Sequence, residues 1–141
     1  MRYKAGWLVP NPILALTHYV PVVTMEDFRD ITTDARVALQ EATQPFHLLI
    51  DNRIIAERTV ANLDAMLKAL PILEHTYLRW IVVVLPDAIR ETAADRQVQR
   101  HGSIQLKYVD SLTSAFQHLA LEDDRIGGVA DMESSWGDWN I

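Results

Sequence analysis

The sequence contains no cysteine and only five glycines among its 141 residues. Without thiols the chain cannot form disulfides, thiolate-bound zinc or iron–sulfur centres, and it has no thiol nucleophile. None of the glycines lies in a glycine-rich turn between a strand and a helix, so the phosphate-binding loops of nucleotide-binding folds are missing as well. The lack of cysteine is compatible with a cytoplasmic protein, and the cytoplasm is the location we expect.

Long apolar runs are also missing. The longest, Trp80 to Pro86, is far too short to span a bilayer and has the length of a buried strand. The first residues have neither the apolar core nor the cleavage site of a signal peptide, so we expect neither export nor a membrane span. The net charge is −6, and no part of the sequence offers a basic surface, so we expect no nucleic-acid partner.

The acidic residues are concentrated at one end of the chain. Residues 122–141 hold six acidic side chains against a single arginine. They also contain Trp136 and Trp139, whose indoles are too apolar for a fully solvated segment. We therefore divide the chain into an α/β domain over residues 1–121 and an acidic tail over residues 122–141. The tail has three open placements: docked on its own domain, docked on a second copy or partner, or disordered.

Hydrophobic periodicity predicts an α/β fold with the order β-β-α-β-α-β-α-β-α. The expected sheet is mixed, mostly parallel and five-stranded, with four helices and an antiparallel hairpin at the start. Alternating or continuous apolar runs predict strands over residues 2–9, 12–20, 46–50, 79–85 and 104–109. Apolar stripes at helical spacing predict helices from 24 to 44, from about 59 to 70, from 88 to 101 and from 112 to 121.

Side-chain chemistry supports several of these boundaries. Thr24 with Asp27 three residues later is a weaker form of the capping box, whose usual partner is Glu or Gln. Asp110 or Ser111 can cap the last helix. Gly102 is expected to end the helix over residues 88–101, because glycine tolerates the left-handed conformation that follows many helices.

Four stretches of the chain resemble a known family in their order and hydrophobic pattern. They are "GWLVPNPILALTHYVPVVTMEDFRDI", "PFHLLIDNR", "LRWIVVVLP" and "IQLKYVDSLTSAFQHL", which together cover roughly Tyr3 to Leu121. In this order they resemble the SpoIIAA-like fold, which holds the STAS domains of anti-sigma-factor antagonists. More closely, the chain resembles a loosely defined bacterial set of STAS/SEC14-like domains of unknown function.

The resemblance implies a non-enzymatic regulatory or protein-interaction module, often dimeric, with a protein partner or a second copy as the expected partner. Its SEC14 side implies an alternative, a carrier or sensor of a small lipophilic or anionic ligand. The chain departs from the family at the turn after Asp51. Phosphorylatable STAS antagonists carry an Asp-Ser-Ser/Thr-Gly-like turn there, and this chain has "DNRIIAERT". Thr59 is the candidate for modification, and it is also the expected N-cap of the next helix.

The same turn is the candidate binding surface. Asp51, Asn52 and Arg53 follow a parallel strand, and open α/β sheets bind their ligands at the carboxyl ends of such strands. Arg53 and Arg58 precede a helix N-terminus and could together accept an anion or a partner's carboxylate. The candidate surface is therefore Asp51, Asn52, Arg53, Arg58 and Thr59. The alternative is an ordinary turn, since Asp and Asn bond their own backbone in turns.

An undetected enzyme is the less favoured second alternative, because the sequence shows no recognisable catalytic motif. Its five histidines lie in separate elements with no pair four residues apart, so we expect no metal site. His47 is interpreted as a strand residue whose ring finds a hydrogen-bond partner. The G-x-S-x-G motif of serine hydrolases is missing, and the paired carboxylates are adjacent in sequence, which points them apart on a helix. We therefore expect no catalytic residues and no cofactor.

Overall fold

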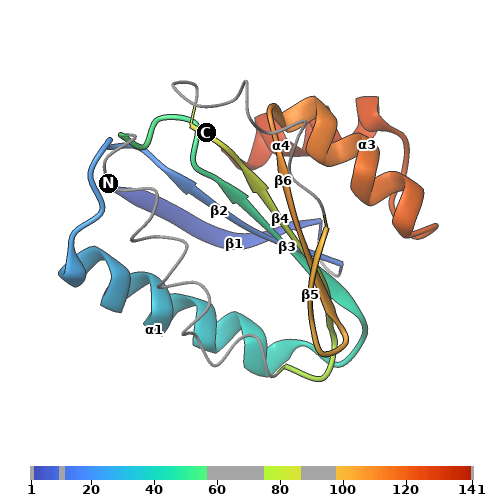
Figure 1. The fold of residues 1–141 in the computed structure, drawn as a ribbon, viewed down its shortest axis with the longest axis horizontal. Coiled ribbons are helices and arrows are strands. Elements are labelled where there is room, and N and C mark those ends of the chain that lie inside the picture. The colour runs from blue at the N-terminus through green and yellow to red at the C-terminus, as the bar shows by residue number, and fades with distance from the viewer. Residues whose placement is uncertain (1, 10–11, 57–74, 87–97, 141) are drawn as a thin grey trace.

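The computed structural model describes residues 2–9, 12–56, 75–86 and 98–140. These residues form a six-stranded sheet with described helices on both of its faces (Figure 1). The strands are β1 (Tyr3–Val9), β2 (Ile13–His18), β3 (Phe46–Asp51), β4 (Leu78–Val84), β5 (Gln99–His101) and β6 (Ile104–Val109). The described helices are α1 (Met25–Glu41), α3 (Leu112–Glu122) and α4 (Val129–Trp139).

The sheet is mixed, with the order β1-β2-β3-β4-β6-β5. β1 and β2 form the expected antiparallel hairpin. β2 to β3, β3 to β4 and β4 to β6 pair in parallel, and β5 pairs with β6 in the antiparallel sense. The α/β class and the mostly parallel sheet are thus confirmed, whereas the strand count exceeds the five that were expected.

The additional strand arises where a helix end was expected. The prediction of helix up to residue 101 is wrong, because Gln99–His101 is strand β5 and pairs with β6. Gly102 has a φ of +64° and lies in the two-residue connection between His101 and Ile104. Its left-handed conformation therefore turns a hairpin rather than ending a helix. The expected helix from about 59 to 70 and most of the one from 88 lie outside the described residues.

Side-chain alternation divides the core into one layer on each face of the sheet. On the α1 face, Phe46, Ile81 and Leu106 pack with Leu39 and Ala42 of the α1 region. On the other face, the buried residues of the strands pack against α3 and α4 through Ala115, Phe116, Leu119, Met132 and Trp136. β3 and β4 are almost entirely buried, which accounts for their continuous apolar sequence.

The start of α1 is fixed by the expected capping box. The Thr24 hydroxyl accepts a hydrogen bond from the Asp27 amide at 3.0 Å, and the Asp27 carboxylate accepts one from the Thr24 amide at 3.0 Å. Asp27 also accepts from Arg2 Nε at 2.8 Å. These hydrogen bonds, that of Arg2 above all, lower the Asp27 pKa to about 2. One buried carboxylate thus joins the N-terminus of α1 to Arg2, the residue before β1.

The tail forms α4 and lies against its own domain. Met132 and Trp136 are buried, with Trp136 only 7% exposed. The Trp139 ring lies 4.9 Å from Lys4 Nζ and 3.6 Å from the position that a Cβ would take at Gly6. The Trp139 indole thus packs closely on β1, at a distance that would give a Cβ at Gly6 an ordinary van der Waals contact. Within the described ranges, no helix has the length and apolar character that a membrane span needs.

Candidate functional site

The turn after β3 is built around a buried carboxylate. Asp51 is 3% exposed, and its Oδ2 accepts from the Thr17 hydroxyl at 3.0 Å and from Arg53 Nη2 at 3.0 Å. Its Oδ1 accepts from the Arg53 amide at 3.1 Å and from Arg53 Nε at 2.9 Å. Thr17 and Asp51 pair in register on β2 and β3, so both strand ends are joined. Asp51 thus orders the turn and has no free oxygen for chemistry.

Backbone hydrogen bonds hold the rest of this turn in place. The Asn52 amide donates to Val84 O at 3.0 Å, the Ile55 amide to Asn52 O at 3.0 Å, and the Ala56 amide to Pro21 O at 2.8 Å. Asn52 is buried, and no described residue donates a hydrogen bond to its Oδ1. Ile54, two residues after Asn52, is 45% exposed at the tip of the turn. A rigid turn therefore presents an apolar side chain to solvent.

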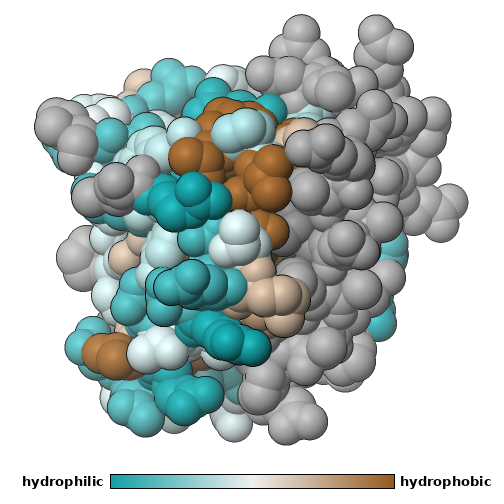
Figure 2. All heavy atoms as spheres, turned by 90° about the vertical axis from the view of Figure 1, so that its left-hand side faces the viewer, coloured by the Kyte–Doolittle hydropathy of each residue, from teal (hydrophilic) through white to brown (hydrophobic). Residues whose placement is uncertain are grey.

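The structure brings together three of the five residues of the predicted surface. Asp51, Asn52 and Arg53 form the turn itself, whereas Arg58 and Thr59 lie outside the described residues. Arg53 remains 38% exposed while it binds Asp51. Tyr19, just beyond the end of β2, is 36% exposed and donates to Asn140 Oδ1 at 2.7 Å. Figure 2, which looks toward this end of the strands, shows hydrophobic atoms among hydrophilic ones.

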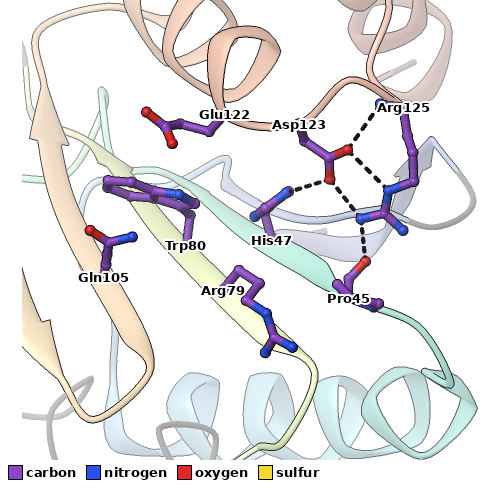
Figure 3. A pocket seen from close by; sticks show the side chains of 8 residues that line it. All are labelled: Pro45, His47, Arg79, Trp80, Gln105, Glu122, Asp123 and Arg125. Atoms are coloured by element: carbon purple, nitrogen blue, oxygen red, sulfur yellow. Dashed lines mark hydrogen bonds and ion pairs between the residues drawn. The ribbon is translucent and has the colours of Figure 1, made fainter.

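A second candidate lies at the opposite, amino-terminal ends of the parallel strands. His47 of β3 pairs in register with Trp80 of β4, and Trp80 pairs with Gln105 of β6. The three residues form one row across the sheet on the face that α3 and α4 cover. Together with Arg79 and the α3–α4 connection they line a recess of about 450 Å³ (Figure 3). We call this the amino-end recess; Pro45, Glu122, Asp123 and Arg125 complete its lining.

Asp123 connects the two walls of the recess. It is the C-cap of α3, and its carboxylate accepts from the Arg125 amide at 2.9 Å and from Arg125 Nη2 at 2.6 Å. Arg125 Nη2 also donates to Pro45 O at 2.5 Å, and Asp123 Oδ2 lies 2.8 Å from His47 Nε2. The Arg125 hydrogen bond holds the pKa of Asp123 far below its usual range. The carboxylate is therefore ionised and can only accept hydrogen bonds.

This fixes the tautomer of His47. Its ring is 3% exposed, and burial lowers its pKa more than the Asp123 carboxylate raises it, so the ring is neutral at pH 7. Because Asp123 can only accept, His47 Nε2 carries the proton and Nδ1 carries a lone pair. Nδ1 is buried and has no partner among the described residues. The expectation of a satisfied ring thus holds for one nitrogen and fails for the other.

Trp80 forms the apolar part of the floor and packs against a residue of α3. The His118 ring meets it edge to face, with 4.2 Å between centroids and 80° between planes. Lys107 Nζ lies 3.5 Å from His118 Nδ1. Burial and the neighbouring Lys107 lower the pKa of His118, so this second ring is also neutral at pH 7. The floor of the recess is therefore ordered before any ligand arrives.

The lining of the recess combines charged and apolar side chains. A His–Asp pair activates a nucleophile in many enzymes, but the eight lining residues include no hydroxyl group. In the described ranges no three His, Asp or Glu side chains converge as metal ligands would. Its charged lining also differs from the enclosed apolar pocket of a lipophilic carrier. That alternative stays a prediction.

Sequence reasoning missed the recess because its residues come from four separate segments. Strand alternation was the usable signal, since it assigns His47 and Leu49 to one face and Phe46 and Leu48 to the other. Which residues of β3, β4 and β6 lie side by side depends on register, which single strands do not reveal. Comparisons with known proteins find no matching family model, no matching curated protein and no matching solved structure. The resemblance to STAS domains therefore stays a prediction.

Proposed function

We propose that this chain is a non-enzymatic protein-interaction module that binds its partner at the carboxyl ends of β2 and β3. The binding surface consists of Tyr19, Pro21, Arg53 and Ile54, and we call it the carboxyl-end surface. The observation that carries the proposal is the exposure of Ile54, 45%, on a turn that buried hydrogen bonds hold rigid. The STAS-like type, a regulatory role and modification of Thr59 belong to the same proposal and rest on the sequence resemblance.

Preorganisation supports this assignment. A protein interface loses affinity for every loop that must be ordered on binding, and the turn after β3 is ordered in advance by Thr17, Asp51 and Arg53. Ile54 and Tyr19 then supply apolar contact area, with the exposed part of the Arg53 guanidinium beside them. Apolar and aromatic side chains with an arginine at the edge are the composition that protein interfaces favour.

The occupied carboxylate of the turn is consistent with a structural role for Asp51 in the proposed binding surface. Both oxygens of Asp51 accept hydrogen bonds from Thr17 and Arg53, so the carboxylate is occupied within the turn. A partner that fits this surface offers an apolar side chain to Ile54 and polar groups to its rim. We expect a protein partner, and a second copy of this chain is the simplest form of it.

The test compares two exposed apolar residues. Ile54→Glu places a charge in the carboxyl-end surface, and Val37→Glu places one on α1, where Val37 is 58% exposed. The full-length variants are purified from their own cells and their assemblies are sized by sedimentation. We expect wild type and Val37→Glu to sediment as a complex and Ile54→Glu to sediment as a bare monomer. The melting temperatures should agree within about two degrees, because exposed substitutions change stability little.

Ile54 is a better probe than Arg53. Arg53→Ala would remove two hydrogen bonds from the buried Asp51 carboxylate, so lost binding could follow from a lost turn. Ile54 makes no such bond with its side chain. Equal assembly of all three proteins would show that the carboxyl-end surface binds nothing, and loss in both variants would show a general effect of added charge.

A further inference from the structure

We propose that the amino-end recess binds a small amino-carboxylate, a zwitterion with a carboxylate and a protonated amine on a short apolar body. This site is independent of the proposed interaction surface, because it lies at the other ends of the same strands. Four features carry the inference: an unpartnered buried acceptor, an arginine placed by an irregularity in the sheet, a carboxylate on the rim, and an indole floor.

The acceptor is Nδ1 of His47. It lies in a ring that is 3% exposed, and among the described residues nothing donates to it. A buried nitrogen without a partner costs free energy, so such atoms are rare in proteins unless a ligand or water satisfies them. Since Nε2 donates to Asp123, Nδ1 can only accept a hydrogen bond. A group that reaches this nitrogen must be a donor, as an ammonium group is, although the nitrogen itself lies beneath the accessible surface of the recess.

Arg79 occupies an irregular position at the rim. Phe46 pairs with Leu78, and His47 pairs with Trp80. Arg79 is therefore an extra residue of β4 that has no paired residue in β3, which makes a β-bulge. Such bulges re-aim a side chain and recur beside functional sites. One guanidinium nitrogen, Nη1, donates to Thr76 O at 2.7 Å, and no carboxylate of the described residues pairs with the group. Arg79 therefore retains donors for a ligand carboxylate.

Glu122 supplies the opposite charge. The Asp123 and Arg125 charges cancel each other in their ion pair, which leaves Arg79 and Glu122 as the net charges of the lining. In the view of Figure 3, Glu122 lies above and Arg79 below the floor formed by Trp80 and His47. A simple anion would face Glu122, and a simple amine would face Arg79. A ligand with both charges suits both of these side chains.

The size and floor of the recess fit such a molecule. About 450 Å³ lies within the range of small-molecule sites, and the Trp80 ring offers an apolar surface for the ligand body. Gln105, in the same row of the sheet, adds an amide that both donates and accepts. Because Asp123, Arg125 and Pro45 fix one wall, the site loses little entropy on binding.

The test is a titration of the full chain, labelled with nitrogen-15, with the standard L-amino acids. We expect saturable shifts of the Trp80 indole N–H and the Gln105 side-chain amide, with a dissociation constant below about 1 mM for at least one of them. The matching amine without its carboxylate, and the matching acid without its amine, should each bind about tenfold more weakly.

Two arginine variants provide the internal control. Arg79→Gln should weaken binding about tenfold, whereas Arg36→Gln, at an exposed position of α1, should leave it unchanged. The same spectra report whether each variant is folded. Three results would overturn the inference. They are the lack of a saturable shift with every amino acid, an acid analogue that binds as tightly as its parent amino acid, and equal binding by the Arg79→Gln and Arg36→Gln variants. None of these outcomes bears on the carboxyl-end surface.

Discussion

Replacing Trp136 by alanine tests whether the acidic tail is a structural part of the domain. The side chain is 7% exposed and packs with Met132, Phe116 and Trp139, with 6.3 Å between the Trp136 and Phe116 ring centroids and 5.2 Å between the two indoles. Truncating a buried tryptophan costs about 3–5 kcal/mol, through lost burial and the cavity left behind. Trp136 lies on an outer helix that can partly collapse, so we expect about 3 kcal/mol.

That loss is large against the stability of an ordinary domain, roughly 5–15 kcal/mol. It corresponds to a fall in melting temperature of about 10 °C. Urea unfolding followed by far-UV circular dichroism measures it without relying on tryptophan fluorescence. Val37→Ala on the exposed face of α1 is the control and should change stability by less than about 0.5 kcal/mol. A loss below about 1 kcal/mol for Trp136→Ala would refute the docking of α4.

Three further predictions concern stability. The pKa of Asp27 is lowered to about 2 from an ordinary 3.8, so its contribution to folding stability is present above pH 4 and is lost as the pH falls toward 2. Between pH 6 and pH 2 the urea midpoint should therefore fall less steeply for Asp27→Asn than for wild type. Equal slopes for the two proteins would contradict this. Asp51→Ala should cost about 2 kcal/mol, because it leaves the buried Thr17 hydroxyl without its acceptor; an unchanged urea midpoint would show that the turn does not depend on it. Gly102→Ala should destabilise the protein by about 1 kcal/mol, because Gly102 has a φ of +64°. Gly137→Ala should stabilise it by about 0.5–1 kcal/mol, because Gly137 lies in α4 with open space around the new methyl group. Shifts of the melting temperature in the same direction for both variants would contradict the assigned backbone conformations.

Local chemistry predicted a large part of the fold. The capping box at Thr24, the antiparallel first hairpin and the continuous apolar strands β3 and β4 all depend on neighbours in sequence or on simple periodicity. Gly102 shows where such reasoning fails. Its left-handed conformation was anticipated, but a left-handed glycine serves both a helix end and a hairpin turn. The dipeptide Gly-Ser between "QRH" and "IQL" was the signal for the hairpin.

The two candidate sites differ in the same way. Asp51, Asn52 and Arg53 are consecutive, so the sequence could place them together at the end of a strand. It could not show that the Arg53 side chain is hydrogen-bonded to the Asp51 carboxylate. The amino-end recess depends on the register of three parallel strands. It also depends on the contact between Asp123 and His47, which are 76 residues apart in the sequence. Such long-range geometry follows from tertiary packing, which no local pattern encodes.

The most direct test of the proposed function is site-specific photo-crosslinking at the carboxyl-end surface in living cells. A photoreactive phenylalanine analogue replaces Ile54 in one version of the full chain and Val37 in the other, since both side chains are exposed. The proposal predicts one discrete crosslinked species from position 54 and none from position 37. Mass spectrometry then identifies the captured protein, or this chain itself if the partner is a second copy. Indistinguishable products from the two positions, or no product from position 54, would contradict the proposal.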